Sequence, residues 1–99
     1  MMFTRIVKMT FRPETIPTFL NNFEEVKERI RSFDGCVFLE LYQDRQRLEV
    51  FFTYSRWQSE AHLEAYRNSE LFQKVWGQTK PLFQEKAAAW SVNTLHHLP

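Results

Sequence analysis

The chain has 99 residues, 43% of them hydrophobic and 25% charged, which suits one folded domain over residues 1–99 and leaves no room for two. Its 13 basic residues are dispersed and nearly balanced by 12 acidic ones, which excludes the basic footprint of a nucleic-acid-binding protein. Because Arg5 and Lys8 interrupt the amino-terminal apolar residues, we expect no signal peptide, no membrane partner and a cytoplasmic location.

A strand and a long helix are predicted at the start of the chain. Residues 3–11 alternate so that the odd positions, mostly apolar, share one face, which is typical of a strand. From Glu14 to Phe33, apolar residues recur mostly at spacings of three and four, which predicts an amphipathic helix. Pro17 falls in its first turn, where proline is tolerated because backbone N–H groups there lack partners. Asp34 and Gly35 then supply a turn.

Two strands, two helices and a final strand are predicted after this turn. Residues 36–43 and 48–55 favour a hairpin joined by the polar run DRQR. Ser59 can cap a helix that extends through Tyr66, and Ser69 can cap another that extends through Trp76. Residues 87–95 predict the last strand. This order predicts an α+β fold, a ferredoxin-like split βαβ arrangement with a four-stranded antiparallel sheet.

The predicted hairpin is apolar on both of its faces, as the neighbours Leu39 and Phe38, or Phe52 and Phe51, illustrate. The helices of the chain can cover only one face, since helices and sheet make two layers. A second copy of the sheet is the simplest cover for the other face, so we expect a homodimer in which two protomers form a dimeric α+β barrel. The alternative is that Phe51 and its neighbours form a tolerated apolar surface.

Residues that commonly bind metals or perform hydrolysis do not cluster in the sequence. His96 and His97 are adjacent and would point to opposite faces, while His62 has no Glu or His one helical turn away. Cys36 is the single cysteine, so it cannot form an internal disulfide and is expected to be a small buried strand residue. The motif Gly-x-Ser-x-Gly is absent, and two glycines are too few for a phosphate-binding loop. We therefore expect no metal site.

Aromatic and polar side chains gather around the second and third predicted helices. The set comprises Tyr54, Trp57, His62, Tyr66, Trp76 and Trp90. Each one taken singly could be an ordinary core residue. Because buried Tyr and Trp need hydrogen-bond partners, the set as a whole favours a cavity with an apolar wall and a few polar tips. Such a cavity would suit a flat aromatic or quinone-like molecule.

Three segments resemble the antibiotic biosynthesis monooxygenase family, namely TRIVKMTFRPE, FDGCVFLEL and, from Trp57 to Phe72, WQSEAHLEAYRNSELF. In similar proteins two chains pair sheet to sheet, and each holds a cavity between its sheet and helices. Several use no metal, flavin or haem and oxidise anthrones or quinols directly with molecular oxygen. The resemblance implies a cofactor-independent monooxygenase or oxidase of a small hydroxylated aromatic or quinol. The alternatives are a non-catalytic small-molecule-binding or stress-response barrel, or isomerase chemistry on a small carbonyl compound.

The resemblance also implies roles for particular residues. His62 and Tyr66 are expected to border the cavity as catalytic residues, with Tyr66 hydrogen-bonded to a substrate oxygen and His62 better suited as a base. A partly exposed helix residue without a role is the alternative for His62. The expected substrate-binding residues are Tyr54, Phe72, Trp76 and Trp90. The haem-degrading branch has Asn, Trp and His where this chain has Val7, Tyr66 and Trp76, so the resemblance implies no haem ligand and no cofactor.

Overall fold

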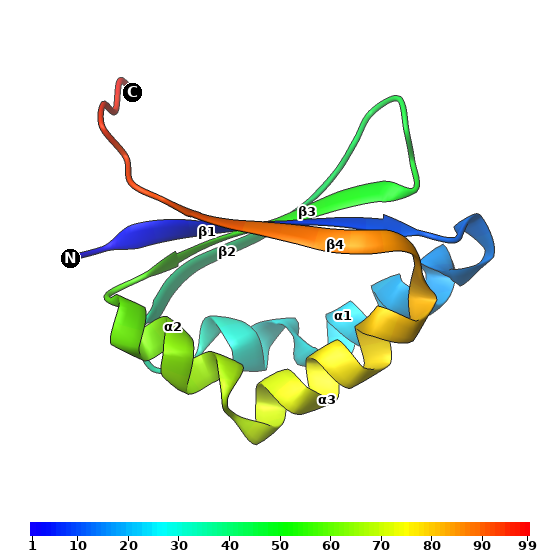
Figure 1. The fold of residues 1–99 in the computed structure, drawn as a ribbon, viewed down its shortest axis with the longest axis horizontal. Helices are drawn as coiled ribbons and strands as arrows, with labels where there is room; N and C mark the ends of the chain where they lie inside the picture. Colours follow the sequence, from blue (N-terminus) through cyan, green and yellow to red (C-terminus); the bar gives the residue numbers. More distant parts are fainter.

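The computed structural model describes residues 1–99 and confirms the predicted α+β architecture. Four antiparallel strands form one sheet in the order β2-β3-β1-β4, and the helices cover one of its faces (Figure 1). The strands are β1 (Phe3–Phe11), β2 (Cys36–Gln43), β3 (Val50–Trp57) and β4 (Phe83–Val92). The helices are α1 (Ile16–Arg31), α2 (Glu60–Arg67) and α3 (Glu70–Thr79), with 3₁₀ turns at Pro13–Thr15 and Lys80–Leu82. None of the helices has the length and apolar character needed to cross a membrane.

Some strand bounds differ from the predicted ones because they depend on which residues pair with β1. β3 ends later than predicted, at Trp57, which pairs with Phe3 at the start of β1. β4 begins earlier than predicted, at Phe83, which pairs with Phe11 and packs against its ring at 5.3 Å. Long-range pairing thus sets the ends of these two strands, whereas local alternation alone sets the approximate position of each strand. The long helix, α1, is shorter at both ends than the predicted range of Glu14 to Phe33.

The register of the central strands assigns side chains to two faces of the sheet. Val7 pairs with Thr53, and both contribute to the wall that faces the helices. Ile6 pairs with Tyr54 on one side and with Trp90 on the other. Because successive residues of a strand point to opposite faces, these three side chains lie on the outer face, away from the helices.

The interior of the protein contains two clusters of buried apolar side chains. One is centred on Phe11, which is 0% exposed and stacks on Phe19 with ring centroids 4.2 Å apart. The other surrounds Trp57, which is 1% exposed, and includes Cys36, a buried residue of β2 as predicted. Residues of both clusters contribute to the cavity described below.

The turn between α1 and β2 fits closely under the beginning of α2. Gly35 has a φ of +90°, a left-handed conformation that glycine adopts without a steric penalty. A Cβ atom at this position would overlap the side chain of His62. The hydroxyl of Ser59 accepts a hydrogen bond from the His62 N–H at 3.3 Å, and that of Ser69 accepts one from the Phe72 N–H at 3.0 Å. Both predicted helix caps are therefore confirmed.

Candidate functional site

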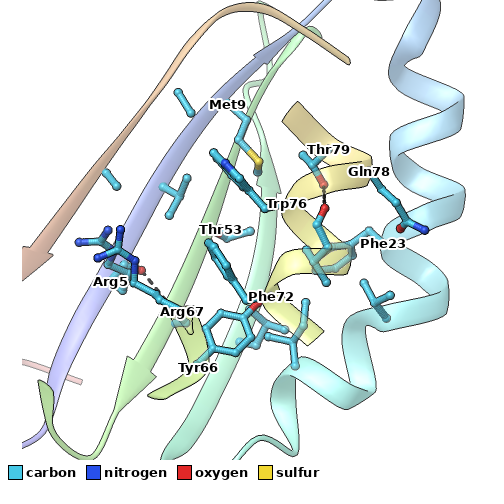
Figure 2. A pocket seen from close by; sticks show the side chains of 18 of the residues that line it. Arg5, Met9, Phe23, Thr53, Tyr66, Arg67, Phe72, Trp76, Gln78 and Thr79 are labelled. Atoms are coloured by element: carbon cyan, nitrogen blue, oxygen red, sulfur yellow. Dashed lines mark hydrogen bonds between the residues drawn. The ribbon is translucent and has the colours of Figure 1, made fainter. Parts of the chain in front are cut away.

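A cavity of about 290 Å³ lies between the sheet and the helices (Figure 2). Sixteen of its 23 lining residues are hydrophobic. Met9 of β1, Phe23 of α1 and Trp76 of α3 illustrate how the sheet and both long helices supply the apolar wall. Its volume is near the lower end of the range for ligand pockets, roughly 300–1,000 Å³. The space therefore suits one small ring system.

Two hydroxyl groups of the lining are hydrogen-bonded within the protein. The Thr79 hydroxyl donates to the carbonyl of Val75 at 2.6 Å, and the Ser55 hydroxyl accepts from Trp57 Nε1 at 3.0 Å. The titratable residues of the lining are Arg5, Tyr66 and Arg67. Charge in this cavity is therefore positive, and it comes from two guanidinium groups.

Tyr66, near the end of α2, is a buried phenol enclosed by other rings. Its side chain is 8% exposed, and its ring centroid lies 5.2 to 5.3 Å from those of Phe33, Trp57 and Phe72. Burial raises the pKa of Tyr66 well above its ordinary value, and the neighbouring Cys36 thiol contributes further. Tyr66 enters the side-chain hydrogen bonds of the protein only through its backbone carbonyl, which accepts from the Ser69 hydroxyl at 2.6 Å. Tyr66 therefore stays a neutral phenol with a hydroxyl free to donate to a ligand.

The raised pKa of Tyr66 predicts a difference in alkaline stability between the protein and its Tyr66→Phe variant. The folded state holds the Tyr66 proton more tightly than the unfolded chain, so this contribution is fully present below pH 10 and is lost as pH rises further. Between pH 9 and 11 the wild-type protein should lose about 1 kcal/mol more stability than Tyr66→Phe. Urea denaturation at both pH values measures this, and parallel losses in the two proteins would contradict it.

Three of the residues predicted to contact a ligand do line the cavity, namely Tyr66, Phe72 and Trp76. The Phe72 and Trp76 rings stack with centroids 5.9 Å apart and an interplanar angle of 11°. Trp76 also packs against Phe83, with ring centroids 5.5 Å apart. Val7 lines the cavity as well, so all three positions that correspond to the haem-degrading branch face the same space.

Tyr54 and Trp90, which were predicted to contact the ligand, lie away from this cavity. Both lie on the outer face of the sheet and do not line the cavity. Tyr54 packs against Phe38 and Tyr42 on that face, with ring centroids 5.8 and 6.1 Å apart, while Trp90 is 48% exposed. The reason is strand alternation, because a shift of one residue moves an aromatic side chain to the opposite face.

His62, which was predicted to border the cavity as a catalytic residue, is not among the residues that line it. Its Nδ1 lies 2.7 Å from the Ser59 hydroxyl, and its Nε2 lies 3.8 Å from a carboxylate oxygen of Asp34. Its side chain packs on Gly35 outside the cavity lining. His62 thus joins the start of α2 to the turn before β2. His, Cys, Asp and Glu side chains form no group of three or more that could hold a metal ion.

Arg5 and Arg67 are site residues that the sequence reasoning missed. Arg5 occupies an odd-numbered position of β1, on the otherwise apolar face between Phe3 and Val7. A charged residue on the buried face of a strand is an unusual placement, because burial of a charge costs free energy without a partner. That placement was the available signal for Arg5, whereas Arg67 resembled any cation in the last turn of a helix.

Comparisons with known proteins agree with this fold. A family model described as antibiotic biosynthesis monooxygenase matches residues 2–76. A Mycobacterium tuberculosis protein has a TM-score of 0.89 at 18% identity, with 100% of each chain covered. A structure described as an antibiotic biosynthesis monooxygenase has a TM-score of 0.89 at 19% identity and covers 97% of this chain and 100% of its own. A Pseudomonas aeruginosa protein has a TM-score of 0.84 at 23% identity, covering 96% and 95%.

No curated protein matches the sequence. The family model nevertheless spans most of the chain, including β1, α1, the hairpin, α2 and most of α3. The chain therefore belongs to the antibiotic biosynthesis monooxygenase family.

Proposed function

We propose that the protein is a cofactor-independent monooxygenase or oxidase that oxidises a small hydroxylated aromatic or quinol with molecular oxygen. Its family supports a monooxygenase role in general. The observation that favours this substrate class is the hydroxyl of Tyr66, which has no side-chain partner within the protein, beside an apolar, partly aromatic cavity of about 290 Å³. An apolar ring would replace water along the walls, and one ring oxygen would accept a hydrogen bond from Tyr66.

Two balanced reactions belong to this class. In an anthrone, the ring methylene loses two C–H bonds and gains a C=O bond, with one oxygen atom of O₂ in the product and the other released as water. In a hydroquinone, two electrons and two protons pass to O₂, which gives a quinone and hydrogen peroxide. Both begin when the substrate loses a proton from oxygen or carbon and transfers electron density to O₂.

Tyr66 supports these reactions as a hydrogen-bond donor rather than as a base. Its raised pKa keeps the proton on the phenol at neutral pH, so it can stabilise a negative charge that develops on a substrate oxygen. Such stabilisation is strongest in an apolar site, where few waters compete. The proton of the substrate passes to solvent.

Oxygen uptake with a panel of anthrones and hydroquinones tests this proposal. The wild-type protein should consume oxygen faster than buffer with at least one compound, and Tyr66→Phe should lower that rate by about 100-fold, as for removal of an oxyanion donor. His62→Ala should retain most of the rate, because His62 lies outside the cavity.

The opposite pattern, in which His62→Ala loses the activity and Tyr66→Phe retains it, would contradict the role proposed for Tyr66. No uptake above buffer with any compound, combined with ligand binding, would favour a non-catalytic binding barrel instead. Oxygen uptake thus separates the enzyme from a protein that only binds its ligand.

We also propose that the protein is a homodimer that pairs through the outer face of its sheet. That face carries apolar and aromatic side chains from all four strands, which the helices on the opposite face leave uncovered (Figure 1). Phe38, Tyr42, Trp90 and Val92 are 38 to 48% exposed there. A second sheet of identical pattern would cover them by two-fold symmetry.

Static light scattering of the wild-type protein should report about twice 12.0 kDa, and Trp90→Glu should halve that mass because it places a charge in the apolar interface. Leu20→Glu is the matched control, since Leu20 is 43% exposed on α1 and lies outside this face. A wild-type mass of 12.0 kDa would exclude the dimer.

A further inference from the structure

Arg5 is a half-buried cation whose hydrogen-bonding capacity is largely unused. A guanidinium offers five N–H donors, and the structure gives Arg5 one side-chain partner, the Ser91 hydroxyl at 3.0 Å. None of the ion pairs includes Arg5. Burial lowers its pKa, and the charge of Arg67 lowers it further. The unused N–H groups of Arg5 can therefore donate hydrogen bonds to an anionic ligand.

Arg67 places a second cation at the same end of the cavity. It occupies the last turn of α2 and lines the cavity together with Arg5 and the preceding residue, Tyr66 (Figure 2). Its one carboxylate partner is Glu64, whose oxygen lies 3.8 Å away, and both side chains are about half exposed or more. This distance exceeds that of a charge-assisted hydrogen bond, about 2.7–2.9 Å, so Glu64 neutralises the charge of Arg67 only weakly.

We infer that Arg5 and Arg67 bind an oxyanion of the aromatic ligand, so that the cavity prefers phenolates or carboxylates to neutral analogues of the same shape. The inference deepens the proposed function and rests on the same cavity. The two guanidinium groups lie beside each other and form a polar end of the cavity, next to Tyr66 of α2. Met9 and Trp76 border the apolar space away from this end (Figure 2). A flat ring would lie against the apolar wall with its acidic oxygen toward the arginines.

The arginine pair also supplies what a phenolic substrate needs in order to react. The lining contributes cations but no carboxylate or imidazole to receive a proton. Two positive charges favour the ionised form of a bound phenol, so its pKa should fall on binding. The cavity would then select the anion from solution, already prepared to give an electron to O₂.

Matched ligand pairs test this inference without turnover. Calorimetric titration compares 2-naphthoate with its neutral methyl ester, and absorbance titration follows the pKa of 2-naphthol free and bound. The wild-type protein should bind 2-naphthoate roughly tenfold or more tightly than the ester, or should lower the pKa of 2-naphthol. Arg5→Gln and Arg67→Gln should each reduce that effect, whereas Arg29→Gln, an exposed residue of α1, should leave it unchanged.

The two arms identify which oxyanion the site takes, since preference for the naphthoate indicates a carboxylate and a lowered naphthol pKa indicates a phenolate. Equal binding of acid and ester together with an unchanged naphthol pKa overturns the inference, as does an effect that survives in both Arg5→Gln and Arg67→Gln. Failure of the proposed function looks different. A protein that prefers the anions but consumes no oxygen refutes the monooxygenase proposal and leaves the arginine site standing.

Discussion

Replacing Gly35 by alanine should lower the free energy of unfolding by about 3 kcal/mol, through backbone strain and overpacking together. Gly35 has a φ of +90°, a conformation that residues with a Cβ rarely adopt. The added methyl would also overlap the side chain of His62, which hydrogen bonds with Ser59 at the start of α2. Urea denaturation followed by circular dichroism measures the change.

Gly77→Ala is the matched control for this substitution. Gly77 lies within α3, and a Cβ atom there would have no heavy atom within 4 Å. The same methyl group should therefore raise the free energy of unfolding by about 1 kcal/mol, because alanine has the higher helix propensity. If the two variants change stability in the same direction, the close contact between His62 and Gly35 is not present in solution.

Replacing Ala89 by tryptophan should abolish oxygen uptake while the protein stays folded. Ala89 pairs with Val7 on the helix-facing side of the sheet, and both line the cavity. An indole ring at this position would occupy much of a space of about 290 Å³ and exclude an aromatic substrate. β4 is an edge strand, so the larger side chain can be accommodated with little change in backbone pairing.

Ala65→Trp controls for the size of the substitution, since Ala65 is an exposed residue of α2 that does not line the cavity. It should keep the wild-type rate of oxygen uptake, as surface substitutions usually change stability by no more than about 0.5 kcal/mol. Thermal unfolding of both variants checks that they fold. Uptake at the wild-type rate by a folded Ala89→Trp protein would place the reaction outside the cavity.

Most of the fold could be predicted from the sequence because its signals are local. Apolar residues at helical spacing locate α1, and the serines at positions 59 and 69 begin α2 and α3 through their hydroxyl groups. The ends of β3 and β4 could not be predicted in this way. They depend on which residues of β1 pair with Trp57 and Phe83, contacts that join distant parts of the chain.

The candidate site was predicted less completely, for a related reason. Tyr66, Phe72 and Trp76 follow from the resemblance and do line the cavity. Tyr66 is a buried residue of α2, and Phe72 and Trp76 lie one helical turn apart on α3. Composition identifies Tyr54 and Trp90 as aromatic residues but could not show that they lie on the face of the sheet away from this cavity. The arginines were missed because their significance depends on lining the same cavity, although Arg5 belongs to β1 and Arg67 to the end of α2.

The most direct test of the central claim is a crystal structure of the protein with an anthrone or hydroquinone bound in the absence of oxygen. We expect the ring within the cavity beside Met9 and Trp76, with one substrate oxygen about 2.7 Å from the Tyr66 hydroxyl. A ligand seated on the outer face beside Tyr54 and Trp90, with the cavity closed by its own side chains, would contradict the account.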